Sequence, residues 1–213
     1  VKSHFERFLK TFPATADQKL QALWEIARAS KELGAGVKKL AKMFENVVEV
    51  YNELPEAKRN ALKEGRNAVA QARFQQAEAL FLAFQRMKLT NPRKIKQQLS
   101  AKAKALLAAK DAFYGVIHFK QAEWAIAAYA RTGEIYQGFA KALVDSPIPK
   151  KLPEELKALY KEQLETEALK VEKTAREAYI KSLETSRTLK VYTTWTRVAE
   201  KALALLLPKE YAE

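Results

Sequence analysis

The chain has 213 residues, 48% of them hydrophobic, with two histidines and no cysteine. This composition is ordinary for a globular protein and excludes disordered and collagen-like chains, while the lack of cysteine excludes disulfide scaffolds, thiolate catalysis and zinc ribbons. The formal net charge is +13, and residues 55–149 hold 16 basic against 7 acidic residues. Such an uneven distribution predicts a surface for an anionic partner.

Helix-favouring residues fill the long stretches between prolines, and alternating β-branched residues are nearly missing, which predicts an all-α fold. A first helix is expected to end near Phe12-Pro13. A second starts after Thr15, because Thr15 and Gln18 have the spacing of a capping box. It ends at the glycine turn 34–36, and a third helix follows over 37–51. Since the turn is short, these two helices must lie antiparallel.

The same signals continue along the chain. A proline suits the first turn of a helix, which favours a helix start at Pro55. The helix that starts there is expected to break at Gly65. A further start is favoured at Asn91-Pro92, with Asn91 as the cap. No stretch of about 18 apolar residues is present to span a membrane. The remaining helices are predicted over 55–87, 92–117, 121–143, 152–189 and 191–207.

The prolines at 147 and 149 interrupt the helical pattern and mark a boundary. We expect residues 1–146 to form degenerate helical repeats and residues 147–213 to form a connection and a C-terminal helical hairpin on the same array. The spacing from Pro13 to Pro55 is 42 residues and from Pro55 to Pro92 is 37, near the tetratricopeptide and HEAT periods. Stacked antiparallel helix pairs bury their apolar stripes and form an α-solenoid with a free groove.

Two groups of residues resemble known repeats. The first group resembles the tetratricopeptide repeat over residues 16–55 and at a Gly-x-x-Tyr match: Leu23, Ile26, Ala27, Leu40, Phe44, Val47, Pro55, Gly133 and Tyr136. The second group resembles the C-terminal segment of tetratricopeptide-repeat envelope proteins of myxobacteria and relatives, including those of adventurous gliding motility: Pro147-Ile148-Pro149, Leu152, Glu155, Tyr160, Leu164, Ala178-Tyr179, Val191-Tyr192, Trp195 and Pro208-x-Glu210-Tyr211.

The resemblance implies a non-enzymatic scaffold that binds proteins in a cell-envelope assembly. It also implies a location in the periplasm or on the periplasmic face of the outer membrane, with the cytoplasm as the alternative. The chain starts at Val1 in what we interpret as a fragment of a longer protein, so a signal or lipid anchor would lie upstream. The envelope role and the location are expectations from this family alone.

The helix after Pro92 has one apolar and one cationic face when drawn at 100° per residue. We predict that a partner binds the cationic face through Arg93, Lys94, Gln97, Lys102 and Lys104. A solvated face without function is the alternative reading. Lys110 falls at the edge of the apolar stripe, where its stem is expected to pack while its ammonium group reaches water.

No motif for catalysis, phosphate binding or metal binding is found, so we expect a non-enzymatic protein without cofactor or metal. His4 and His118 are interpreted as surface or packing residues, and Trp24, Trp124 and Trp195 as core residues. The favoured partner is an acidic protein segment. The alternative function is binding of nucleic acid or another polyanion by the basic region 86–110, although no aromatic residue interleaves with its cationic face.

Overall fold

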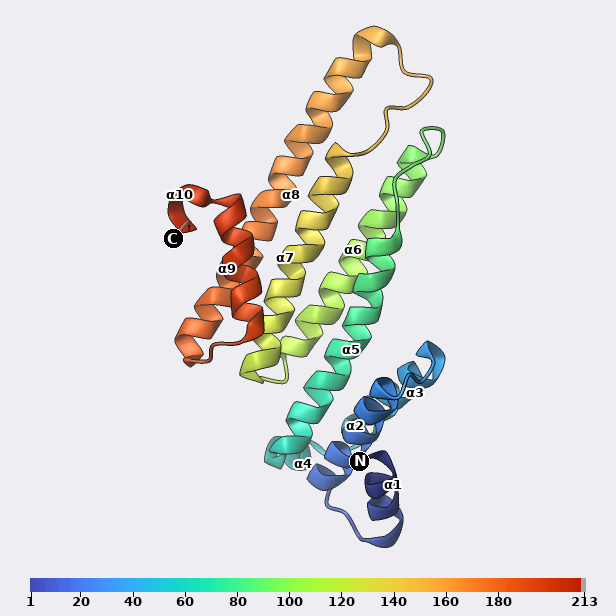
Figure 1. Cartoon of the computed structure of the whole chain (residues 1–213), viewed down its shortest axis with the longest axis vertical. Helices are drawn as coiled ribbons and strands as arrows, with labels where there is room; N and C mark the ends of the chain where they lie inside the picture. The colour runs from blue at the N-terminus through green and yellow to red at the C-terminus, as the bar shows by residue number, and fades with distance from the viewer. Residues whose placement is uncertain (212–213) are drawn as a thin grey trace.

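The structure is a computed structural model that describes residues 1–211, and every regular element among these residues is a helix (Figure 1). The predicted all-α fold is therefore confirmed. No helix in this part of the chain combines the length and the apolar character needed to cross a membrane. The helices are α1 (Lys2–Thr11), α2 (Ala16–Glu32), α3 (Val37–Asn52), α4 (Glu56–Ala61), α5 (Glu64–Arg86), α6 (Ile95–Ile117), α7 (Ala122–Val144), α8 (Glu154–Leu189), α9 (Thr194–Leu206) and α10 (Pro208–Tyr211).

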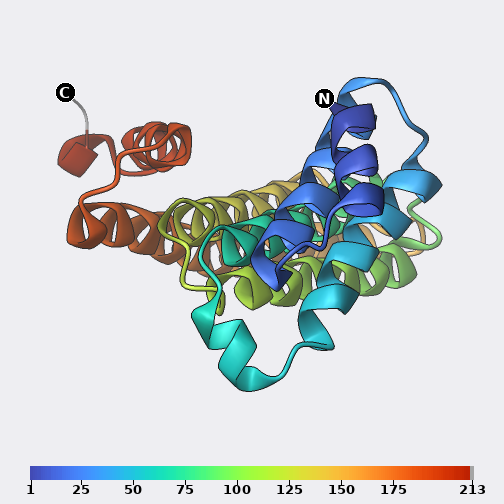
Figure 2. The ribbon, with the colours of Figure 1, turned by 90° about the horizontal axis from the view of Figure 1, so that it is seen from below.

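Four long helices, α5 to α8, lie side by side and form the body of the molecule (Figure 1). Helices α2 and α3 pack on α5, α1 packs on α2, and the short α4 precedes α5, whereas α9, followed by α10, packs on α7 and α8 at the other side of the row (Figure 2). Helix α8 has 36 residues and α7 has 23. At 1.5 Å per residue α8 is about 54 Å long, so it extends well beyond α7.

The start of α2 follows the predicted capping box. The Thr15 hydroxyl accepts a hydrogen bond from the Gln18 N–H at 3.3 Å, and the Gln18 side chain accepts one from the Thr15 N–H at 3.0 Å. Helix α2 then ends at Glu32, before a turn in which Gly34 has a φ of +77°. This left-handed conformation is the one that glycine adopts without strain, so the predicted stop of the helix is confirmed.

Asp17 in the first turn of α2 also holds the start of α5. One oxygen of its carboxylate accepts hydrogen bonds from the N–H groups of Lys63 at 2.8 Å and Gly65 at 2.9 Å. A Cβ at position 65 would lie 3.0 Å from that oxygen and 3.2 Å from the Asp17 Cα. Gly65 therefore permits the close approach of α2 to α5, and Asp17 satisfies N–H groups that a helix start leaves without partners.

The predicted helix over 55–87 is interrupted, but not at Gly65. Helix α4 ends at Ala61 and α5 begins at Glu64, with buried Leu62 and exposed Lys63 between them. Leu62 packs into the core formed by α2, α3 and α5. Anchoring Leu62 in that core and capping the next helix with Asp17 places the break at 62–63, a tertiary effect that local sequence signals do not contain.

Buried side chains form a series of local cores in chain order. The first joins α2, α3 and the start of α5 and includes Trp24. The second joins α5, α6 and α7, with Trp124 and Trp195 packed against it. Two smaller clusters join α7 to α8 and α8 to α9. The three tryptophans lie in or against these cores, as predicted, and His4 and His118 are exposed.

Two later helices start three residues after their predicted positions. Asn91 does not cap α6; its side chain accepts a hydrogen bond from the Arg93 N–H at 3.0 Å and closes a turn, and the helix begins at Ile95. Helix α9 begins at Thr194, where Thr193 forms a capping box with Thr196. In both places a short polar side chain bonds to the nearby backbone and delays the helix.

Candidate binding site for an acidic partner

The candidate site lies where two connections meet at one end of the helical row, α5–α6 (residues 87–94) and α7–α8 (residues 145–153) (Figure 1). The turn at Asn91–Lys94 is held by a hydrogen bond at its start and by a buried side chain directly after its end. Gln98 of α6 accepts a hydrogen bond from the Asn91 N–H at 3.0 Å, and Ile95 is buried in the helical body. The basic side chains of the α5–α6 turn therefore project from a well-defined backbone.

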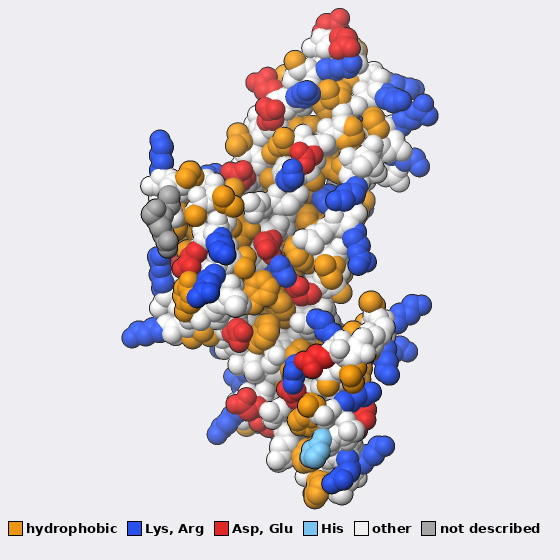
Figure 3. All heavy atoms as spheres, viewed as in Figure 1, with side chains coloured by type: hydrophobic (Ala, Val, Ile, Leu, Met, Phe, Trp, Pro, Cys, Tyr) orange, Lys and Arg blue, Asp and Glu red, His pale blue; other side chains and the backbone are white. Residues whose placement is uncertain are grey.

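Together with the first turn of α6, the two connections line an open cavity of about 710 Å³. We call it the basic cavity. No acidic residue is among its lining residues, and none of its five cations forms an ion pair with a carboxylate of residues 1–211. All five cations are exposed. The lining residues are Pro92, Arg93, Lys94, Ile95, Lys96, Gln97, Pro149, Lys150 and Lys151. Figure 3 shows Lys and Arg side chains gathered at this end of the molecule.

The electrostatics of the α6 start add to the positive potential of the cavity. A helix N-terminus carries about half a positive charge, and proteins normally place acidic residues there. In α6 the N-cap position is Lys94, no side chain caps the helix, and the first turn contains Lys96 but no acidic residue. Cations and the positive helix end repel one another here, so a bound anion would relieve an unfavourable arrangement.

The five residues predicted for the site separate into three groups. Arg93, Lys94 and Gln97 line the basic cavity. Lys104 is exposed but lies further along α6 and is not a lining residue. Lys102 is only 4% exposed, so its predicted place on the cationic face is wrong. The structure thus brings three of the five residues together.

Lys102 packs against the end of α5. Its ammonium group donates hydrogen bonds to the backbone carbonyls of Phe84 at 3.0 Å and Met87 at 2.8 Å, and it lies 4.1 Å from the centre of the Phe84 ring. Burial, and then the positive charge of Lys88, lower the pKa of Lys102. The helical projection of α6 missed this role because it shows one buried stripe, whereas α6 packs on both α5 and α7. A cation is favourable at a helix C-terminus, where the carbonyls lack partners.

Lys150 and Lys151 are the residues that sequence reasoning missed. We interpreted the segment around them only as a boundary, and more than fifty positions separate it from Arg93. Periodicity within one helix cannot pair two loops. The only signal in the sequence is the pair of lysines directly after two prolines, which places them on a connection.

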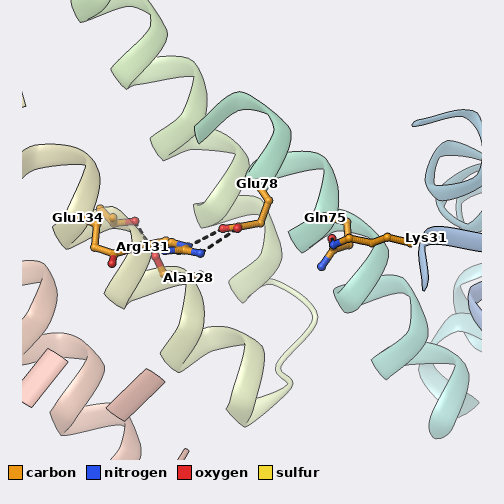
Figure 4. A network of polar contacts seen from close by, with 7 residues as sticks. Lys31, Gln75, Glu78, Ala128, Arg131 and Glu134 are labelled. Atoms are coloured by element: carbon orange, nitrogen blue, oxygen red, sulfur yellow. Dashed lines mark hydrogen bonds and ion pairs between the residues drawn. The ribbon is translucent and has the colours of Figure 1, made fainter. Parts of the chain in front are cut away.

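In a second polar cluster, centred on Arg131 of α7, the guanidinium group is already paired with two carboxylates (Figure 4). The Arg131 guanidinium donates to both carboxylate oxygens of Glu78 on α5, at 2.6 and 2.9 Å, and also pairs with Glu134. Its central carbon lies 4.6 Å from the centre of the Trp195 ring of α9. The cluster connects α5, α7 and α9. The figure also shows Lys31 of α2 bonded to Gln75 of α5.

An apolar groove of about 510 Å³ lies between α3 and α5. Val37 and Leu40 of α3 face Leu80 and Leu82 of α5, and the exposed fractions of Val37, Leu80 and Leu82 are 80%, 42% and 47%. These side chains are more exposed than core positions. Within residues 1–211, no group of three or more histidine, aspartate or glutamate residues is arranged to hold a metal ion.

Comparison with known proteins identifies no relative: no family model, no curated protein and no solved structure matches the chain. The functional assignment therefore depends on the geometry and charges of the chain itself.

Proposed function

We propose that the protein is a non-enzymatic interaction scaffold, built as a tetratricopeptide-like solenoid, that binds acidic segments of partner proteins in its basic cavity. The pairs α2–α3, α5–α6 and α7–α8 serve as its repeats, and α9–α10 covers the last of them. The observation that carries the proposal is the convergence of five cations, four from two distant connections and Lys96 from the first turn of α6, on one cavity without an acidic residue.

The contacts between helices support the solenoid. In such an array the first helix of each pair packs on the first helix of the next, and the second helix of each pair packs on that same helix. The corresponding contacts in this chain are α2 with α5, α5 with α7 and α7 with α9, together with α3 with α5, α6 with α7 and α8 with α9. Each pair thus makes extensive contacts with the next pair in the chain.

The basic cavity suits an acidic peptide better than a nucleic acid. Phosphate groups need only clustered cations, but single strands are usually bound by aromatic side chains on which the bases stack. No aromatic residue lines the cavity among the described residues. Carboxylates need only the five cations, which would also raise the rate of association with an acidic partner.

The apolar groove between α3 and α5 supplies the second element of a scaffold, because apolar contacts add affinity that charges alone do not provide. From the sequence resemblance to envelope proteins of myxobacteria, we propose that this scaffold acts in a cell-envelope assembly, with gliding motility as one such assembly. On that basis we propose the periplasm, or the periplasmic face of the outer membrane, as its location.

The test is a binding titration with a short fluorescein-labelled polyglutamate peptide, repeated with single-stranded DNA. The variant Lys94→Glu/Lys96→Glu changes the N-cap lysine and a first-turn lysine of α6. The variant Lys38→Glu/Lys39→Glu reverses two lysines in the first turn of α3 as a matched control. We expect the cavity variant to weaken peptide binding about tenfold or more near 0.15 M salt and the control to retain affinity.

Two outcomes contradict the proposal. Equal losses in the cavity variant and the control would mean that only the net charge matters. Tighter binding of DNA than of polyglutamate, with a steep dependence on salt, would favour the polyanion function instead.

A further inference from the structure

A second region of the chain has the opposite charge distribution to the basic cavity. Between Met43 and Ala57 the chain has four acidic residues and no Lys or Arg. Three of them, Glu45, Glu49 and Glu53, are spaced four residues apart along α3, and all are exposed. We call these three residues the acidic stripe. None of them forms an ion pair with a cation of residues 1–211.

The acidic stripe does not stabilise its own helix. Like charges four residues apart on a helix cost about 0.2–0.5 kcal/mol per pair. Glu53 is the C-cap residue of α3, and the last turn of that helix contains no basic residue. The negative charges therefore lie at the negative end of the helix, where cations are favoured.

The acidic stripe and the basic cavity thus each hold side-chain charges of the same sign as the nearby helix end, and the two charges are opposite in sign. Helix α6 begins with Lys94 and Lys96 at its positive end, and α3 ends with Glu49 and Glu53 at its negative end. Contact between the two helix ends would pair the side-chain charges and also align the helix dipoles favourably. At 1.5 Å per residue the stripe is about 12 Å long, which is long enough to meet cations from both connections.

The two surfaces are too far apart to meet within one molecule. Helix α3 lies near the N-terminal end of the fold, and the cavity lies at the opposite end of the helical row (Figure 1). We propose that the acidic stripe of one copy of the chain docks in the basic cavity of a second copy. This inference rests on the proposed function, since it names one acidic segment that the cavity accepts.

The docking is head-to-tail. Each contact occupies the stripe of one copy and the cavity of the other, so each copy keeps its second surface free and successive copies can add in a row or a ring. Each copy has a net charge of +13, so whole molecules repel one another. Near 0.15 M salt the Debye length is about 8 Å, which screens this repulsion while charges in direct contact still attract; near 1 M it is about 3 Å and the docked pairs weaken too.

Sedimentation velocity of the full chain tests the proposal. We expect the average mass of the wild type to rise above 24.2 kDa with concentration at moderate salt and to return to that value at high salt. The stripe variant Glu49→Gln/Glu53→Gln and the cavity variant Lys94→Glu/Lys96→Glu should each remain monomeric. All four positions are exposed, and circular dichroism checks that both variants fold.

The decisive sample is an equimolar mixture of the two variants. It contains one intact stripe and one intact cavity, so it should form a one-to-one dimer that does not grow. A wild type that stays monomeric at all concentrations, or a stripe variant that still associates, would overturn head-to-tail docking. The polyglutamate titration separates this failure from that of the proposed function, because the stripe variant should bind the peptide as the wild type does.

Discussion

Gly133 of α7 packs directly against the ring of Tyr179 on α8. A Cβ at position 133 would lie 2.6 Å from two ring carbons, a distance that no side chain tolerates. Tyr179 is fully buried, and its hydroxyl donates a hydrogen bond to Gln137 at 2.8 Å, one turn along α7 from Gly133. Glycine thus sets how closely these two long helices approach, and the tyrosine hydroxyl fixes the ring in place.

We expect Gly133→Ala to destabilise the protein by about 1–3 kcal/mol, because the ring is enclosed and α8 must shift. Gly115 in α6 is the matched control, since nothing lies within 4 Å of a Cβ built there. Gly115→Ala should stabilise the protein by about 0.5–1 kcal/mol through its better helix propensity. Urea denaturation of both variants measures the two values, and a loss in both would show that close approach to Tyr179 is not the cause.

Lys102 should matter for stability and not for partner binding. Lys102→Met removes the donor to the Phe84 and Met87 carbonyls, and we expect a loss of about 1–3 kcal/mol with unchanged polyglutamate affinity. Lys104→Met, an exposed substitution two residues away, should change stability by less than about 0.5 kcal/mol. An equally stable Lys102→Met would mean that the cost of burying the ammonium group cancels its hydrogen bonds.

The pKa of Lys102 gives this contribution a pH dependence of known sign. The pKa is lowered in the folded state, so above it the unfolded chain binds more protons than the folded chain, up to the ordinary value of 10.5. Stability from this group therefore rises as the pH increases towards 10.5. We expect the stability difference between wild type and Lys102→Met, measured by urea denaturation at several alkaline pH values, to grow with pH; a constant or shrinking difference would contradict the assignment.

Lys96 should affect stability and binding in opposite directions. Lys96→Glu places an acid in the first turn of α6, where it interacts favourably with the helix dipole and should stabilise the protein by about 0.3–1 kcal/mol. The same change removes a cation from the basic cavity and should weaken polyglutamate binding. Thermal denaturation and peptide titration of one sample measure both effects. Lys104→Glu, in mid-helix and outside the cavity, should show neither.

The bidentate pair between Arg131 and Glu78 should be coupled more strongly than surface ion pairs. Both side chains are only about one fifth exposed. A double-mutant cycle with Arg131→Met and Glu78→Gln should give a coupling energy of about 1–3 kcal/mol. The exposed pair of Arg28 and Glu32 on α2 has a similar distance of 2.7 Å and serves as the control, with an expected coupling below about 0.5 kcal/mol. Equal values for the two pairs would contradict a role for burial.

The sequence predicts the helices well where their boundaries depend on neighbouring residues. The capping box at Thr15 and the glycine turn before α3 act locally, and both boundaries are confirmed, while α8 begins at Glu154, two residues after its predicted start. The break between α4 and α5 was misplaced because its cause, a hydrogen bond from Gly65 to Asp17, joins residues 48 positions apart.

The binding site was predictable only in part, for the same reason. Arg93 and Lys94 lie on a visible basic segment, but Lys150 and Lys151 join them through the packing of four helices. Lys102 was misplaced because a projection of one helix shows a single buried stripe and omits the second neighbour. The periodicity of each helix, taken alone, thus does not predict which distant segments contact one another.

The bond from Asp17 to the start of α5 has a consequence for how the array loses its structure. If α2 detaches, the backbone N–H groups of Lys63 and Gly65 lose their acceptor, so fraying of the first hairpin exposes the next helix as well. Amide exchange at the beginning of α5 should therefore follow the opening of α2 and not proceed at its own rate. One carboxylate oxygen should thus make α2 and the beginning of α5 open as a single cooperative unit.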